Sequence, residues 1–156
     1  MSYGLEYCNT TNHQVVENYV KTRKLQYLIS EFPGEKIHSH ALRAAEAARC
    51  ANAQGKFRDL HDQLFSHQRE LGATGIKDAA HAAGLNEPQF SACLAAGKYA
   101  EAVRHTEEAK SKLGIPRTPV FVVGGGNPGK IKVGRALVGT QPFAVFQQPI
   151  DSLLAK

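Results

Sequence analysis

The spacing of hydrophobic and polar residues predicts a helix and a strand in the first third of the chain. Apolar residues recur at helical intervals over about residues 5–21, which predicts an amphipathic helix. They then alternate with polar residues, with Leu25, Tyr27 and Ile29 on one side, and Phe32-Pro33-Gly34 follows. This alternation predicts a strand over residues 25–30 that ends at the proline-glycine turn.

The middle of the chain, residues 39–113, reads as a block of helices with short turns. Asn86-Glu87-Pro88 is a favourable helix start, because the asparagine can cap the first turn and proline is tolerated there. Glycines at 55, 84 and 114 end helices, since glycine readily adopts the left-handed conformation. The pattern predicts helices over residues 39–55, 57–71, 75–83, 86–96 and 99–113.

The last third returns to strands and ends in a helix. Residues 119–123 are continuous, apolar and β-branched, as in a buried strand, and residues 131–138 alternate as its partner. Residues 124–130 form the turn between them. A final helix covers residues 142–154, where Pro149 should kink it or delay its start. This order predicts an α/β fold.

Length and composition indicate one soluble domain. The 156 residues, 42% hydrophobic, suffice for one ordinary core. No apolar run approaches the roughly 20 residues that a membrane-spanning helix needs. The first residues have neither a basic start nor an apolar stretch, so we expect no secretory signal, no membrane partner and, for the chain as written, a cytoplasmic location.

The net charge of +5 is concentrated at the C-terminal end. Residues 110–156 hold seven basic residues and one acidic residue, Asp151. A basic region can bind nucleic acid, but no aromatic residues alternate with these charges to stack on bases. We therefore expect solvated surface charge and no nucleic-acid partner.

Two short motifs could indicate a metal site and a phosphate-binding loop, but both are better explained as ordinary loops or turns. His38-Ser39-His40 lacks a nearby third ligand, so we expect no metal. Residues 124–130 match the GxxxxGK of a phosphate-binding loop, but Ile131 stands where Ser or Thr should bind the metal ion. A strand also follows where the phosphate-binding loop requires a helix, so we expect a hairpin.

Several sequence pieces, taken in order, resemble the DsbA-like branch of the thioredoxin superfamily. They span about residues 13–155 and are Val16-Glu17-Asn18-Tyr19-Val20-Lys21-Thr22, Glu31-Phe32-Pro33, Ala44-Ala45-Glu46-Ala47-Ala48-Arg49-Cys50-Ala51, Gln54-Gly55-Lys56-Phe57, His61-Asp62-Gln63-Leu64-Phe65, Phe90-Ser91-Ala92-Cys93-Leu94, Leu113-Gly114-Ile115-Pro116-Arg117-Thr118-Pro119-Val120-Phe121 and Val138-Gly139-Thr140-Gln141-Pro142-Phe143.

The resemblance implies a thioredoxin-like fold with an inserted helical subdomain. Residues 1–156 would form one DsbA-like domain, with its core in residues 1–38 and 114–156, the insertion in 39–113, and the family's first strand lacking. The family performs thiol–disulfide exchange or isomerisation at a Cys-x-x-Cys motif that starts the first helix, where the thiolate is stabilised. A cis-proline loop beside it binds the substrate strand, and the resemblance places Thr118 and Pro119 there.

The sequence departs from the family because it contains no Cys-x-x-Cys. If Cys8-Asn9-Thr10-Thr11 corresponds to the motif, Thr11 replaces the second cysteine and Cys8 is a single catalytic thiol that cannot resolve a mixed disulfide. An ungapped comparison instead places the motif at residues 1–4, both thiols are absent, and Cys8 lies two turns into the helix. We favour the ungapped comparison.

Cys50 and Cys93 also match family positions, one on each of two helices of the insertion. They would form a disulfide if the helices cross at these positions. The alternative is a pair of buried free cysteines that act as small apolar residues.

The resemblance suggests three functions for this chain. The first is a degenerate or truncated relative of disulfide oxidoreductases and isomerases, with impaired redox activity and no cofactor. The second is a monothiol or glutathione-dependent oxidoreductase or transferase that uses Cys8, and the third is a non-catalytic peptide-binding module. The expected partners are protein thiols or extended peptides, and a second copy that pairs at an exposed sheet edge. Family members are usually exported to the periplasm or cell envelope.

Overall fold

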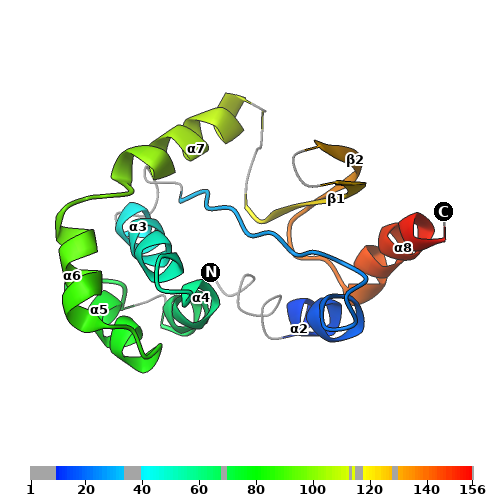
Figure 1. The fold of residues 1–156 in the computed structure, drawn as a ribbon. Coiled ribbons are helices and arrows are strands. Elements are labelled where there is room, and N and C mark those ends of the chain that lie inside the picture. The colour runs from blue at the N-terminus through cyan, green and yellow to red at the C-terminus, as the bar shows by residue number, and fades with distance from the viewer. Residues whose placement is uncertain are drawn as a thin grey trace. The chain divides into compact units, whose positions relative to one another are not determined.

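The computed structural model describes residues 10–33, 40–67, 70–112, 114, 118–127 and 130–155. The chain divides into two compact units (Figure 1). One consists of Met1–Ile29 and Ile115–Lys156, and the other of Ser30–Gly114. We call them the sheet unit and the helical unit.

The sheet unit contains a hairpin and helices from both ends of the chain. Its helices are α2 (Thr11–Val15), the π-helical turn η1 (Val16–Val20) that continues α2, and α8 (Phe143–Leu154). Strands β1 (Val120–Asn127) and β2 (Lys130–Val138) pair antiparallel, with Val120 opposite Val138. A bulge follows Val123, since Val123 faces Arg135 while the next residue, Gly124, faces Val133.

One face of the hairpin is packed against the helices. The buried core of this unit joins residues of α2, η1, both strands and α8: Val15, Tyr19, Val123, Leu137, Phe146 and Ile150. Phe121 contacts Phe146 edge-to-face, with ring centroids 4.9 Å apart. The helices thereby hold the hairpin in place, and with it the two loops at the Val120–Val138 end.

The helical unit consists of α3 (Ala41–Asn52), α4 (Phe57–Ser66), α5 (Ala73–Ala82), α6 (Glu87–Ala95) and α7 (Ala100–Lys112). Small alanines of α3 and α5 pack with larger residues such as Leu60, Ile76 and Phe90, all nearly fully buried. The predicted start of α6 is confirmed, because the Asn86 side chain accepts a hydrogen bond from the Gln89 backbone N–H at 3.0 Å.

The extended segment before α3 is tied to the helical unit by a polar cluster. Arg49 of α3 donates two hydrogen bonds to the Glu31 carboxylate, at 3.0 and 3.2 Å, and one to the Thr106 hydroxyl of α7. Lys110 of α7 donates to the Ser30 hydroxyl and to the Glu31 carbonyl oxygen. Partial burial lowers the pKa of Lys110. One arginine and one lysine thus fix residues 30–31 to α3 and α7.

The strand predicted over residues 25–30 is wrong. Leu25, Tyr27 and Ile29 are half-buried and alternate with exposed neighbours, as predicted, but the segment is extended and is not one of the two strands of the sheet (Figure 1). A strand requires a hydrogen-bonded neighbour, and within the described residues β1 and β2 pair only with each other. The hydrophobic alternation therefore records which side is buried and does not establish a sheet.

Several element boundaries also differ from the prediction. Of the helix predicted over about residues 5–21, residues 5–9 lie outside the described residues, Thr10 is not helical, and α2 begins at Thr11, at a run of polar residues that favour helix caps. Gly124–Asn127 belong to β1 rather than to the turn. Gly126 has a positive φ of 155°, which glycine adopts more readily than other residues. Finally, α4 ends at Ser66 and α8 begins at Phe143 and continues through Pro149.

Candidate functional site

A pocket of about 350 Å³ lies at the start of α2 and of α8, within the sheet unit. Among the described residues that line it, none is charged and most carry hydroxyl or amide groups. The lining residues are Thr10, Thr11, Gln14, Thr140, Gln141, Pro142 and Phe143. This composition suits an uncharged polar group, such as a peptide amide, better than an ion.

One hydrogen bond across 130 residues of sequence joins the two sides of the pocket, and a local one fixes the loop on one side. The Thr11 hydroxyl donates to the Gln141 carbonyl oxygen at 3.1 Å, and Thr11 is 6% exposed. The Gln141 side-chain amide donates to the Val138 carbonyl oxygen at 3.0 Å, which fixes the loop after β2. The shape of the pocket therefore depends on the fold of the unit, because these two hydrogen bonds fix the position of the loop after β2.

Thr118 and Pro119 lie at the same end of the hairpin as the pocket. The peptide bond between them is cis, Thr118 is exposed and Pro119 is half-buried. The Gly139 N–H donates to the Pro119 carbonyl oxygen at 2.8 Å. Gly139, at φ 79°, directly precedes Thr140 of the pocket. One hydrogen bond thus joins the proline segment to the loop that forms one wall of the pocket.

Tyr19 anchors α8 beneath this region. Its hydroxyl donates to a carboxylate oxygen of Asp151 at 2.7 Å, and its ring lies 6.2 Å from that of Phe143. Burial of the phenol, reinforced by the hydrogen bond to Asp151, raises the pKa of Tyr19 to about 12. The phenol is therefore neutral at physiological pH and acts as a hydrogen-bond donor.

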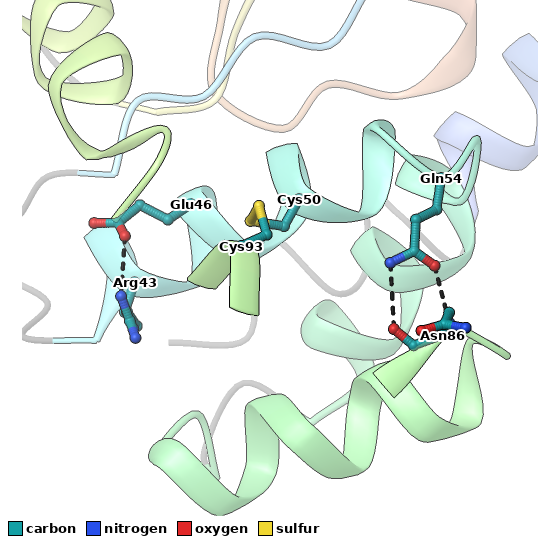
Figure 2. Close-up of a disulfide and its surroundings, with 6 residues drawn as sticks. All are labelled: Arg43, Glu46, Cys50, Gln54, Asn86 and Cys93. Carbon is teal, nitrogen blue, oxygen red and sulfur yellow. Dashed lines mark hydrogen bonds and ion pairs between the residues drawn. A yellow bond between two sulfur atoms is a disulfide. The ribbon is translucent and has the colours of Figure 1, made fainter. Parts of the chain in front are cut away.

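Cys50 and Cys93 form a disulfide between α3 and α6 of the helical unit (Figure 2), with Cα atoms 6.0 Å apart. Beside it, Gln54 and Asn86 exchange two hydrogen bonds between side-chain amide and backbone, at 2.9 and 3.4 Å. Of the two alternatives for this pair, the structure thus shows the disulfide. Neither sulfur lines the pocket, so the bond holds two helices together.

The remaining candidate residues divide between described and undescribed parts of the chain. Cys8 and residues 1–4, which carry the two placements of the missing motif, lie outside the described residues, as do His38 and Ser39. Among the described residues, no group of three His, Cys, Asp or Glu side chains could hold a metal ion. In the same part of the chain, no helix is long and apolar enough to span a membrane.

Sequence reasoning missed the pocket, although it had singled out the segments that form it. Thr10 and Thr11 belong to the tetrad considered for Cys8, and residues 140–143 belong to the last piece of the resemblance. Nothing local indicates that the two segments meet, because their contact depends on how α2 packs beside α8. The available signal was that both segments were compared with family motifs: residues 138–143 as a matching piece, and Cys8–Thr11 as the less favoured placement of the missing Cys-x-x-Cys.

Comparisons with known proteins identify a family, longer relatives and a similar solved structure. A family model described as Thioredoxin matches residues 7–132. The chain is 31% identical over 119 residues to a protein named Na(+)/H(+) antiporter NhaA 3 from Salinispora tropica, which covers 76% of this chain and 18% of that protein. It is 34% identical over 103 residues to Na(+)/H(+) antiporter NhaA 1 from Mycobacterium sp. (strain KMS), covering 65% and 17%. The chain thus spans less than a fifth of these relatives.

The similar solved structure is of a DsbA protein. The crystal structure of Wolbachia pipientis alpha-DsbA1 superposes with a TM-score of 0.80, at 20% sequence identity. The match covers 99% of this chain and 81% of that one. At this identity the match establishes the fold, and the chemistry has to be argued from the residues of this chain.

Proposed function

Because this chain belongs to the thioredoxin family and has a DsbA-like fold, as its motifs predicted, we propose that it binds extended segments of other proteins and has impaired dithiol redox activity. The observation that carries the proposal is the uncharged polar pocket joined to Pro119 through Gly139. Backbone amides of an extended peptide match hydroxyl and amide partners of this kind. Thr118, exposed at the same end of the hairpin, adds a further polar contact.

The cysteine chemistry supports the redox part of the proposal. Dithiol exchange needs a second thiol to attack the mixed disulfide formed by the first. The 156 residues contain no Cys-x-x-Cys, and two of the three cysteines are joined to each other in the helical unit. In an insulin-reduction assay we therefore expect no turnover above the dithiothreitol background, and measurable turnover would contradict this part.

Peptide binding can be tested by filling the pocket. Thr140→Arg adds a long charged side chain to one wall, and Thr74→Arg makes the same replacement at an exposed position of α5. The probe is a fluorescently labelled, S-carboxymethylated unfolded lactalbumin, which offers extended segments without free thiols. By fluorescence anisotropy we expect Thr140→Arg to weaken binding about tenfold or more, or about 1.4 kcal/mol.

Two controls make the experiment decisive. Thr74→Arg should bind as the native chain does because Thr74 does not line the pocket, and Cys8→Ala should do so because peptide binding at hydroxyl and amide groups needs no thiol. If Thr140→Arg binds as tightly as Thr74→Arg, or if no variant binds, peptide binding at this pocket is excluded.

A second candidate function is monothiol exchange at Cys8. Its support is that Thr10 and Thr11, the last two residues of the tetrad that begins with Cys8, line the pocket. In this reaction the Cys8 thiolate attacks a disulfide, the S–S bond breaks, and one sulfur leaves as a thiolate. A glutathione thiolate would then attack the substrate sulfur of this mixed disulfide. The bond to Cys8 breaks, Cys8 leaves as a thiolate, and the substrate is left joined to glutathione by a new disulfide.

The monothiol function predicts a reactive thiol. Alkylation of Cys8 by iodoacetamide should then persist well below about pH 8.5, where an ordinary cysteine is mostly protonated. Mass spectrometry of the alkylated peptide measures the rate, and Cys8→Ala gives the background. A rate that falls as for a free cysteine rejects this candidate and leaves the peptide-binding proposal untouched.

The antiporter relatives extend the proposal to longer proteins. They share 103 to 119 aligned residues with this chain, so we infer that thioredoxin-type units of this kind also occur within proteins named as transporters. Sodium–proton exchange is a property of those whole proteins and forms no part of the function proposed for this chain.

A further inference from the structure

The outer edge of β1 carries backbone groups without a strand partner among the described residues. Within them the sheet has two strands, so each strand is paired on one side only. The Gly139 N–H bonds to the Pro119 carbonyl oxygen, which makes residues 119 and 139 a hydrogen-bonded pair. Such pairs alternate along an antiparallel ladder. Phe121 therefore bonds to β2, while the N–H and C=O groups of Val120 and Val122 point away from it.

Side chains make this edge open to a second strand. β1 has the sequence VFVVGGGN, with no charged residue, and Val122 is 56% exposed. The neighbouring β2 instead carries the exposed basic residues Lys132 and Arg135. Lysine and other charges on an edge strand discourage pairing with a second chain. The charges of β2 thus oppose pairing at its outer edge, whereas β1 carries no charge that would oppose pairing at its own outer edge.

We propose that β1 pairs antiparallel with β1 of a second copy of this chain, forming a four-stranded sheet in the order β2-β1-β1-β2. Identical strands related by a two-fold axis satisfy each other's outward N–H and C=O groups equally. The uncharged sequence of β1 brings no like charges together at the seam, although the chain has a net charge of +5. The basic residues of β2 lie on the two outer strands, where they oppose further growth of the sheet.

The test is the mass of the chain in solution as a function of concentration, by size-exclusion chromatography with light scattering. The native chain should rise from 16.9 kDa toward twice that mass. Val122→Pro removes an outward N–H without removing a ladder bond to β2, so this variant should stay monomeric at concentrations where the native chain is dimeric. Circular dichroism confirms that the variant is folded.

A second pair of variants keeps the test valid if proline disturbs the strand. Val122→Lys places a charge at the seam in both copies, whereas Ala136→Lys adds the same charge directly opposite on β2, one strand away from the seam. Val122→Lys should weaken dimerisation at least tenfold, with partial recovery in high salt, and Ala136→Lys should dimerise as the native chain does.

Three outcomes would overturn the proposal: a native chain that is monomeric at every concentration, a Val122→Pro variant that dimerises normally, or equal losses from Val122→Lys and Ala136→Lys. Peptide binding is measured independently, because Val122 does not line the pocket. A failure of either proposal therefore leaves the other standing.

Discussion

Tyr19 connects η1 with α8 through its hydrogen bond to Asp151. Because of this contact, the stability of the sheet unit should change with pH in the alkaline range. Because the folded-state pKa is raised from 10.0 to about 12, the folded chain keeps the phenol proton over a range in which the unfolded chain has lost it. The stability that this phenol contributes is fully present below about pH 10 and is lost as the pH rises toward 12.

Replacing Tyr19 with Phe should remove this part of the alkaline pH dependence. Between pH 10 and 12 the free energy of unfolding should therefore fall less steeply in Tyr19→Phe than in the native chain, as urea denaturation measures. Tyr99→Phe, in the helical unit, serves as the control and should keep the native slope. If the free energy of unfolding falls with pH as steeply in both variants as in the native chain, the contact with Asp151 does not raise the pKa of Tyr19.

Among the elements, α3 and α7 are held together with the extended segment by the Arg49 cluster. A lysine at position 49 keeps the charge but loses the planar fork that bonds both Glu31 oxygens and Thr106. We expect Arg49→Lys to lower the free energy of unfolding by about 1–2 kcal/mol, since charge-assisted bonds in a partly buried site are lost.

Arg43→Lys provides the matched control on the same helix. Arg43 makes a single ion pair with Glu46, at 3.1 Å, and its side chain is 45% exposed. Its partner Glu46 is buried, but a lysine at position 43 keeps the charge and can still make this single ion pair, so Arg43→Lys should cost clearly less stability than Arg49→Lys. If thermal unfolding shows that Arg49→Lys and Arg43→Lys lose the same amount of stability, the guanidinium contacts of Arg49 with Glu31 and Thr106 make no special contribution.

An element could be predicted from the sequence when the contacts that determine it lie within a few residues of one another. The Asn86 cap of α6 acts within three residues, so the sequence predicted the start of that helix to within one residue. The alternation in residues 25–30 correctly separated half-buried from exposed positions, but a strand also needs a neighbour that no local pattern specifies.

The candidate site was predictable only where a motif carried the information. Thr118 and Pro119 were placed from the family resemblance, and the structure has them beside the pocket loop. The bond from Thr11 to Gln141 joins residues 130 positions apart, and hydroxyl-to-carbonyl contacts of this kind leave no periodic pattern in the sequence. The pocket was therefore found from the fold.

For the molecule as a whole, the two units have separate hydrophobic cores. The core of the sheet unit contains residues of α2, η1, the hairpin and α8, whereas the main core of the helical unit is built from α3 to α6 and includes Cys50. The Cys50–Cys93 disulfide closes a loop of 43 residues inside the helical unit. In the chain-entropy account, a crosslink of this length stabilises the folded state by roughly 4 kcal/mol.

Removing the disulfide should therefore destabilise the helical unit selectively. In the double variant Cys50→Ala/Cys93→Ala, hydrogen–deuterium exchange should accelerate in residues 40–112 and remain near native in residues 118–155, because the second core loses no crosslink. Cys8→Ala, which retains the disulfide, should exchange as the native chain does. Equal acceleration in both ranges would mean that the chain unfolds as one cooperative body, so that a crosslink in one core stabilises the other.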